Sequence, residues 1–379
     1  MQRLNHLIIV LAIFITATPL ICGETADIPA LLQDFIKDNN APGVALAILH
    51  KGETEPEVYS AGVQNRENKI PFTGKTRIKA GSTTKVFTAY RIMMLMEEGE
   101  LSKDTKLTEF FPDYTNGDSI TIERLLTHSS GLPEMLMVEP FHSRMDSAYA
   151  PMDIWKMVAP LKLDFDPGYK IKYSNTNYLI LGLIIEKLTG NSFNSEIRSK
   201  IIEPLRMEHA IPATDDLHVP DLATGYNSSG EVKYPISLIP PQATGGIIAS
   251  AEDLVQLVNG YQLMKNDPLN PNVKSVLLTN GNLGIAPQDV PGFHCEQGFS
   301  EGFEVDYYFL PSVRIIGKLG EFPGFVSGFY YWPDVETGVA ITTNQEDASL
   351  QVMALARDVL VEYVKSRIIP DGLRIRSGK

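Results

Sequence analysis

Apolar residues change their spacing along the chain, and the first part combines a helical spacing with two strands. After Asp27, leucine, phenylalanine and isoleucine recur at every third or fourth position until Ala41-Pro42-Gly43 ends the pattern. Two short apolar runs follow at 44–49 and 58–63, separated by a polar turn. The first pattern is typical of an amphipathic helix and the second of a β-hairpin. This part is therefore predicted to begin an antiparallel sheet with a helix packed on it.

The long middle part, from Thr88 to about Leu310, is predicted to consist mostly of helices and loops. The segment 88–96 is apolar nearly all round, which indicates a buried helix. Two further helices are expected at 122–128 and 175–188, and Ser250 is expected to cap another. The segment 266–299 is rich in proline, glycine and asparagine, which predicts a loop.

From Gly302 onward, apolar and polar residues alternate, which predicts strands at 303–310, 313–318, 327–332 and 338–343. A closing amphipathic helix is expected at 350–364, and 366–379 is predicted to be a loose tail. The layout predicts an α/β (α+β) fold, in which an antiparallel sheet is flanked by helices. The sheet part covers about 27–87 and 302–365, and a mostly helical insertion covers about 88–301. We expect a cleft between these parts, since ligand sites concentrate at such junctions.

The chain has 379 residues and a net charge of −13, which argues against a nucleic-acid partner. Residues 1–23 resemble a signal peptide, with a basic start at Arg3, an apolar centre at 7–15 and a cleavage site near Gly23. We therefore expect a secreted or periplasmic protein with no stable membrane insertion after cleavage. An uncleaved N-terminal anchor is the alternative. Cleavage would remove Cys22 and leave Cys295 without a partner for an internal disulfide.

Ser82 and Lys85 are the first candidates for chemistry. They are three residues apart at a predicted helix start, so their side chains share one face of the helix. A serine hydroxyl needs an adjacent base to act as a nucleophile, and a lysine amine at this spacing can reach it. The alternative is an ordinary helix start, with Ser82 as the N-cap and Lys85 in solvent.

Two further triplets follow in order, Tyr173-Ser174-Asn175 and Lys318-Leu319-Gly320. A second Tyr-x-Asn match, Tyr114-Thr115-Asn116, lies in a turn too soon after the nucleophile helix and is set aside. The three triplets together resemble the signatures of the serine beta-lactamase and penicillin-binding-protein superfamily. The tyrosine version is similar to class C beta-lactamases, related DD-peptidases and family VIII esterases. The resemblance covers about 27–365 and includes the segments 125–133, 243–250 and 323–325.

The resemblance implies a beta-lactamase/transpeptidase-like fold and acyl transfer through a covalent serine ester, without a cofactor or a metal ion. Ser82 would attack the substrate carbonyl, and Lys85 and Tyr173 would transfer the proton of its hydroxyl. Lys318 would be the neighbouring cation that helps to keep Lys85 partly neutral. The main base is left open between Lys85 and Tyr173, because coupled groups share their protons. Asn175 would donate to the substrate. The expected oxyanion hole lies beside Gly320 and consists of two backbone N–H groups, those of Ser82 and Glu321.

Two positions depart from the resemblance and bear on the substrate. Leu319 replaces a hydroxyl residue that helps to hold a substrate carboxylate, and Glu321 adds an anion nearby. Both favour esters, amides or substrates with a cationic end, as in a D-amino-acid peptidase or a carboxylesterase. The alternatives are a D-alanyl-D-alanine carboxypeptidase, a class C-like beta-lactamase, or an inactive relative that only binds ligands. The expected partner is a small molecule or a peptide. Glu321 pointing to solvent is the competing interpretation, and His128 is expected to fix a loop.

Overall fold

The computed structural model describes residues 27–144, 149–214, 219–232, 237–265, 295–300, 303–308 and 314–368. The predicted signal peptide and Cys22 lie outside these residues, as do 266–294 of the predicted loop and 369–379 of the predicted tail. Within the described part, no helix is long and apolar enough to cross a membrane.

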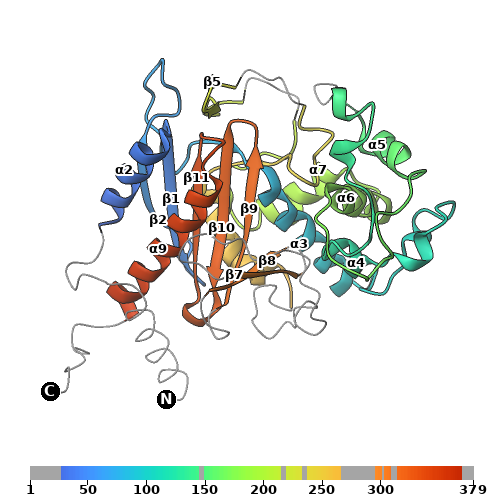
Figure 1. Cartoon of the computed structure of the whole chain (residues 1–379). Coiled ribbons are helices and arrows are strands. Elements are labelled where there is room, and N and C mark those ends of the chain that lie inside the picture. Colours follow the sequence, from blue (N-terminus) through green and yellow to red (C-terminus); the bar gives the residue numbers. More distant parts are fainter. Residues whose placement is uncertain are drawn as a thin grey trace.

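The centre of the fold is a seven-stranded antiparallel sheet with the order β2-β1-β11-β10-β9-β8-β7 (Figure 1). Its strands are β1 (Gly43–His50), β2 (Glu57–Gly62), β7 (Cys295–Ser300), β8 (Phe303–Tyr308), β9 (Arg314–Phe322), β10 (Phe325–Trp332) and β11 (Thr337–Thr343). Two strand pairs lie outside it: β3 (Ile78–Lys79) pairs with β6 (Ile248–Ala249), and β4 (Tyr226–Asn227) pairs with β5 (Gly230–Glu231). The predicted fold class, an antiparallel sheet flanked by helices, is confirmed.

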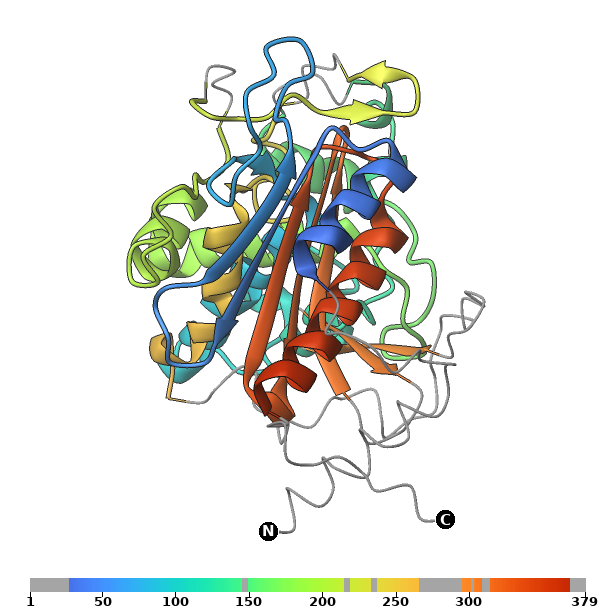
Figure 2. The same ribbon diagram turned by 90° about the vertical axis from the view of Figure 1, so that its left-hand side faces the viewer.

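Helices cover both faces of the sheet. On one face, α2 (Ile28–Asn39) and α9 (Ser349–Ile368) lie side by side (Figure 2). Alternate residues of β1 pack on the two faces of the sheet, because successive side chains of a strand point in opposite directions. Val44, Leu46 and Ile48 pack in the cluster under α2 and α9, which we call the α9-side cluster. Ala45, Ala47 and Leu49 pack in the larger cluster on the opposite face. Burial on both faces explains why the run 44–49 is apolar throughout.

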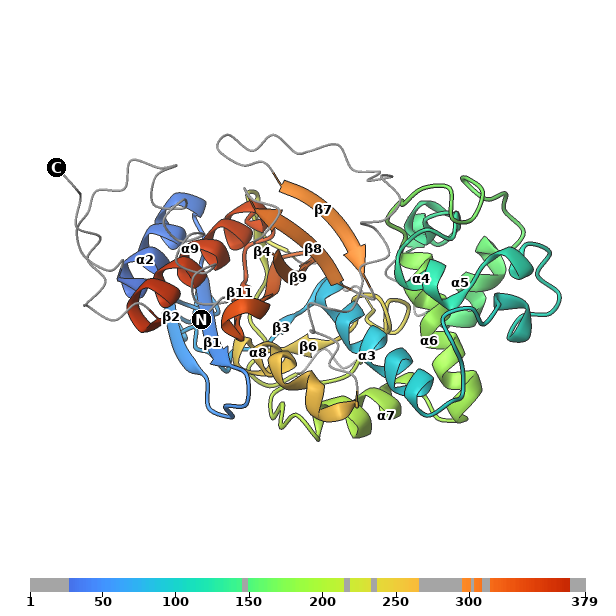
Figure 3. The same ribbon diagram turned by 90° about the horizontal axis from the view of Figure 1, so that it is seen from below.

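The larger cluster joins the sheet to the helical part of the chain (Figure 3). Its helices are α3 (Thr84–Glu97), α4 (Ile122–Leu126), α5 (Pro151–Val158), α6 (Asn175–Thr189), α7 (Phe193–Ile197) and α8 (Ala251–Val255). Eleven of the fourteen residues of α3 are buried, in agreement with the predicted buried helix. The helix α3 runs between the sheet and α6, so its first turn lies where the two parts of the fold meet.

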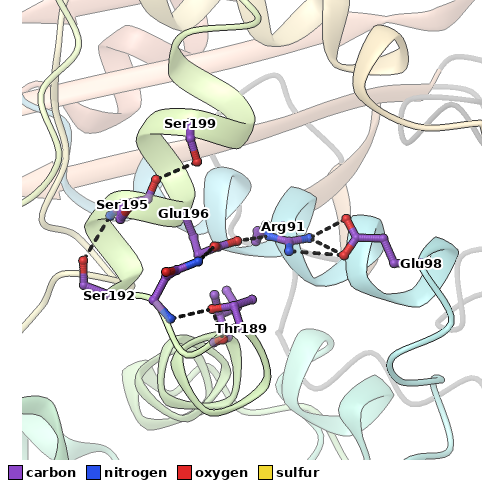
Figure 4. A network of polar contacts seen from close by, with 9 residues as sticks. Arg91, Glu98, Thr189, Ser192, Ser195, Glu196 and Ser199 are labelled. Carbon is purple, nitrogen blue, oxygen red and sulfur yellow. Dashed lines mark hydrogen bonds and ion pairs between the residues drawn. The ribbon is translucent and has the colours of Figure 1, made fainter.

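A buried ion-pair network around Arg91 anchors the middle of α3 (Figure 4). The Arg91 guanidinium donates to Glu196 of α7 at 2.7 Å, and both side chains are only 3% exposed. Glu98 accepts a second set of hydrogen bonds from the same guanidinium. Burial raises the pKa of the Glu196 carboxyl, but hydrogen bonds from Asn191 and Arg91 outweigh it, so that the pKa lies below its ordinary value. The carboxylates thus hold α3 and α7 together through a permanent cation.

Three boundaries differ from the prediction. The strand β7 lies inside the predicted loop 266–299, so the sheet part includes residues before 302. Its residues lack apolar alternation, but β7 is the edge strand and needs a single neighbour, β8. The strand β9 continues past Lys318 to Phe322, and α9 continues to Ile368, into the predicted tail.

Candidate active site

The three triplets predicted to carry the chemistry come from distant parts of the chain. Ser82 lies in the 3-10 turn Gly81–Thr83, which we call the Ser82 turn, and Lys85 lies in the first turn of α3. Tyr173 precedes α6, and Asn175 is its first residue. Lys318 lies on β9, the strand that packs against the Ser82 turn. The site is therefore at the junction of the sheet and the helical part.

Ser82 contacts two of the predicted proton-transfer groups. Its Oγ lies 2.8 Å from the Tyr173 phenol oxygen, and Lys85 Nζ donates to it at 3.0 Å. The N-cap position of α3 is occupied by Thr83 and not by Ser82, and Lys85 is fully buried. The interpretation of Ser82 as an ordinary N-cap with a solvated Lys85 is therefore wrong.

Lys85 faces three oxygen acceptors. Besides Ser82, its Nζ donates to Asn175 Oδ1 at 2.8 Å and to the Thr244 carbonyl at 2.7 Å. An ammonium group uses all three contacts, whereas a neutral amine has two protons and one lone pair. The Asn175 and Thr244 oxygens can only accept, and the Ser82 hydroxyl can also donate. A neutral Lys85 therefore gives its protons to Asn175 and Thr244 and directs its lone pair at the Ser82 hydroxyl.

Tyr173 lies between two lysines. The Nζ atoms of Lys85 and Lys318 are each 5.0 Å from the centroid of its ring, and Lys318 is 3% exposed. Nearby cations favour the negatively charged form of a phenol. This arrangement brings a hydroxyl, two amines and a phenol together, as the family resemblance implied, and it places two candidate bases on Ser82.

The buried ring of His128 lies beside that of Tyr173. Its ring centroid is 4.5 Å from that of Tyr173, and its Nδ1 accepts from the Ser174 backbone at 3.2 Å and from Asn177 Nδ2 at 3.1 Å. Burial lowers its pKa well below the ordinary value, and the charges of Lys85 and Lys318 lower it further. The ring is therefore neutral with its proton on Nε2, and its two hydrogen bonds fit the predicted loop-fixing role.

Asn175 has a partner that the sequence analysis missed. Glu134 accepts from the Asn175 backbone N–H at 2.7 Å and from its side-chain Nδ2 at 3.2 Å. The Asn175 amide thus connects Lys85 to a carboxylate. Glu134 directly follows Pro133, the last residue of the segment that resembles the family, and an acidic residue at that position was the available signal.

Glycines allow β9 to lie directly against the Ser82 turn. A Cβ at Gly320 would come within 2.1 Å of the Ala80 carbonyl oxygen, and one at Gly81 would come within 2.8 Å of the Glu321 nitrogen. Pairing of β9 with β8 stops at Gly317, so the following edge of β9 faces the turn instead of a strand. The backbone N–H groups predicted to form the oxyanion hole, those of Ser82 and Glu321, thus belong to two segments in close contact.

Buried hydroxyl groups also hold the Ser82 turn against the sheet. Ser327 Oγ of β10 donates to the Ala80 carbonyl at 2.7 Å, and Thr83 Oγ1 lies 2.7 Å from the same Ser327 oxygen. Because the single Ser327 proton is used on Ala80, Thr83 is the donor in the second bond. Both hydroxyls are fully buried, so they restrict movement of the Ser82 turn relative to the sheet.

The side chains of Leu319 and Glu321 lie on the other face of β9 from Lys318, as strand alternation requires. Leu319 packs against the α9-side cluster, and Glu321 accepts a hydrogen bond from Ser349 at the start of α9. The end of β9 borders a cavity of about 470 Å³. Its lining residues are Glu321, Phe322, Pro323, Glu346, Asp347, Ser349, Leu350 and Gln351.

The remaining candidates have structural surroundings. Tyr114, of the second Tyr-x-Asn match, is buried with its ring centroid 5.0 Å from that of Trp155 in the helical part. Among the residues that the structure describes, no group of three or more histidine, cysteine, aspartate or glutamate side chains could hold a metal ion.

Comparisons with known proteins agree with this architecture. The family model described as Beta-lactamase matches residues 28–362. Penicillin-binding protein 4 of Amycolatopsis lactamdurans is 30% identical over 184 residues, which cover 47% of each chain. The chain spans about half the length of the curated relatives it matches.

Solved structures share the fold over most of the chain. The D-amino acid amidase of Ochrobactrum anthropi SV3 has a TM-score of 0.74 at 23% identity, covering 90% of this chain and 98% of its own. The penicillin binding protein of Bacillus halodurans has a TM-score of 0.70 at 25% identity, covering 86% and 98%.

Proposed function

This chain belongs to the beta-lactamase family, and we propose that it is an exported serine hydrolase that cleaves amide or ester bonds through an acyl-enzyme. The observation that carries the proposal is the pair of proton acceptors on Ser82: the Lys85 amine at 3.0 Å and the Tyr173 phenol at 2.8 Å. An activated serine is what acyl transfer requires.

In the acylation step, Ser82 Oγ forms a bond with the substrate carbonyl carbon as its proton leaves. The lone pair of neutral Lys85 lies on that proton's path, while Tyr173 lies within reach to pass a proton to the departing nitrogen or oxygen. Both groups contact Ser82, so we treat them as one coupled pair in which Lys85 takes the serine proton. The bond between the carbonyl carbon and the leaving group then breaks, and the protonated leaving group departs.

Deacylation repeats these roles with water. A water molecule loses a proton to the same pair and attacks the ester carbon, after which the proton returns to Ser82 as the acid product leaves. In both steps the negative carbonyl oxygen is stabilised by the backbone N–H groups of Ser82 and Glu321. One such donor typically contributes about 2.7–4 kcal/mol to stabilising the transition state.

The substrate preference is argued from this chain's own residues, because the amidase shares the fold at only 23% identity. Leu319 offers no hydroxyl to a substrate carboxylate. Glu321, whose side chain lies on the face of β9 away from Lys318, adds a negative charge near the end of the same strand and would disfavour an anionic substrate group through space. We therefore propose esters and D-amino-acid amides or peptides as substrates, ahead of substrates with a carboxylate beside the scissile bond.

A labelling experiment tests the activity. Wild-type protein is expected to react with a fluorophosphonate probe, and Ser82→Ala is expected to lose all labelling. Thr83→Ser is the matched control, since it keeps the neighbouring hydroxyl and leaves Ser82 in place. A wild type that stays unlabelled but binds a fluorescent penicillin reversibly would favour the alternative of a ligand-binding relative.

A substrate panel tests the preference. We expect short-chain nitrophenyl esters and D-amino-acid amides to be cleaved with higher kcat/KM than nitrocefin or D-Ala-D-Ala peptides. Glu321→Gln removes the negative charge, so it should reduce the difference in kcat/KM between these substrates and the carboxylate-bearing ones. Faster cleavage of nitrocefin or of the D-Ala-D-Ala peptides would instead favour the beta-lactamase or carboxypeptidase alternative.

Export is proposed from the predicted signal peptide at 1–23. Expression of the full chain should give a mature protein in the periplasm or the medium, with its N-terminus near Gly23 by mass spectrometry. Full-length protein retained in the membrane fraction would favour the uncleaved anchor.

A further inference from the structure

Glu134 is a carboxylate beside the site with three hydrogen-bond donors around it. It precedes the short 3-10 turn Met135–Met137, and the Leu136 backbone N–H donates to its Oε1 at 3.0 Å. The other two donors belong to Asn175, whose backbone N–H reaches Oε2 and whose Nδ2 reaches Oε1. The start of α6 and the turn after Pro133 are thus joined through one side chain.

These contacts decide which way the Asn175 amide is turned. The oxygen and nitrogen ends of an asparagine have nearly the same shape, so the surrounding hydrogen bonds determine the orientation. In the structure the oxygen end faces Lys85 Nζ, and the nitrogen end faces Glu134. An ionised carboxylate can only accept, so turning the amide over would place two acceptors against each other at Glu134. Glu134 therefore favours the observed orientation.

The orientation matters for the base. With the amide oxygen towards Lys85, a neutral amine gives one proton to Asn175 and one to Thr244, and keeps its lone pair for Ser82. With the amide turned over, an Asn175 N–H would point at Lys85 and compete with the Ser82 proton for that lone pair. The observed orientation also leaves the second Nδ2 hydrogen of Asn175 for a substrate oxygen, the role expected from the sequence.

We propose that Glu134 is a positioning residue of this hydrolase, which acts on Lys85 and on the substrate through the Asn175 amide. The inference rests on the proposed serine hydrolase function and adds a residue that the motifs do not contain. It predicts that the effect of Glu134 on the acylation rate constant requires the Asn175 amide.

The test is a pre-steady-state measurement of acylation by a nitrophenyl ester. In Glu134→Gln, the new NH₂ group must face a donor, either the Asn175 backbone, Leu136 or the Asn175 side chain, and the amide orientation is no longer fixed. We expect the acylation rate constant to fall about 10- to 100-fold, as for other small misplacements near a reacting group. The apparent substrate dissociation constant should change far less. Glu134→Ala, which removes the acceptor without adding a donor, should lower the same rate constant.

Two controls separate positioning from folding. Glu139→Gln is on the same loop, where the exposed Glu139 carboxylate accepts a hydrogen bond from the Ser143 backbone, and this variant should keep the wild-type rate. Thermal unfolding checks that each variant is folded at the assay temperature, and a general loss of packing would raise the dissociation constant together with the rate loss.

A double-mutant cycle gives the decisive comparison. In an Asn175→Ala background, Glu134→Gln should cause less than a twofold further loss in the acylation rate constant. The same large loss with and without Asn175, or no loss in either single variant, would overturn the inference. Failure of the proposed function looks different, because the wild type itself would then form no acyl-enzyme and take no fluorophosphonate label.

Discussion

The first turn and the middle of α3 each hold a buried basic side chain, and the two side chains have different kinds of partner. Near the start, Lys85 donates to a hydroxyl, an amide oxygen and a backbone carbonyl. Two turns later, Arg91 donates to the carboxylates of Glu196 and Glu98. Both residues are buried, Lys85 completely and Arg91 almost completely.

The difference in partners indicates that Lys85 serves the reaction and Arg91 the stability of the fold, although both lie on α3. A carboxylate partner favours the charged form of a cation, and the arginine guanidinium stays protonated in any case. Neutral oxygens accept from an ammonium or an amine but supply no opposite charge, so they favour the charged form of Lys85 less than a carboxylate would. We therefore expect changes at Lys85 to alter the reaction, and changes at Arg91 to alter folding.

Lys85→Arg should give the largest effect. The guanidinium keeps its proton and has no lone pair for Ser82, so kcat/KM for a nitrophenyl ester should fall about 10²- to 10⁴-fold, the usual contribution of a positioned base. Steady-state kinetics at several pH values checks this. Recovery of activity at high pH with the wild-type profile would assign the base role to Tyr173 instead.

Arg91→Met should give the converse result. It leaves the Glu196 carboxylate buried without its cation, and breaking such a pair typically costs about 3–5 kcal/mol of stability. Urea unfolding measures the loss, while kcat at a temperature where the variant is folded should stay within twofold. Lys156→Met is the matched control, because its pair with Asp153 is exposed at 69% and 52% and contributes at most about 1 kcal/mol. Equal losses in both variants would contradict the account.

His128 should make the fold sensitive to mild acid. Its pKa is lowered in the folded protein, chiefly by burial, so the unfolded chain binds a proton first as the pH falls below about 6.5. The contribution of neutral His128 to the free energy of unfolding is present above that pH. Below it, this contribution is lost at up to about 1.4 kcal/mol per pH unit. His128→Asn, which suits the positive φ of 55° at this residue, should flatten that slope, whereas exposed His142→Asn should not.

Glu196 should give a smaller effect at lower pH. The net shift of its pKa is downward, so the folded protein binds fewer protons than the unfolded chain below about pH 4.5. Stability is retained above that pH and declines as the pH falls through the folded-state value. Comparing the unfolding free energies of wild type and Glu196→Gln between pH 5 and 3 should show a shallower decline in the variant.

The sequence predicted the elements whose pattern is local. The spacing of Ser82 and Lys85 needs only a helix start to bring the two side chains together, and the apolar run 44–49 needs only a strand buried on both faces. The family resemblance was needed to connect Tyr173 and Lys318 with them, since no local spacing relates residues about ninety and two hundred positions apart. The family itself is confirmed by the match over 28–362.

Other features had no such signal. The Thr244 carbonyl is a backbone group, so its contact with Lys85 could not be predicted from the type of residue at position 244. The edge strand β7 lacks alternation and depends on pairing with β8. The directions of Leu319 and Glu321 follow from strand parity once Lys318 is placed, but the predicted strand ended at Lys318.

The central claim is that Ser82 becomes acylated because Lys85 can take its proton. Intact mass and peptide mapping after brief mixing with a nitrophenyl ester test it most directly, with wild type, Lys85→Arg and Arg91→Lys compared. The account predicts an acyl adduct on the Ser82 peptide in wild type and in folded Arg91→Lys, formed at similar rates, and little or none in Lys85→Arg. An adduct on another residue, or equal rates in all three proteins, would contradict it.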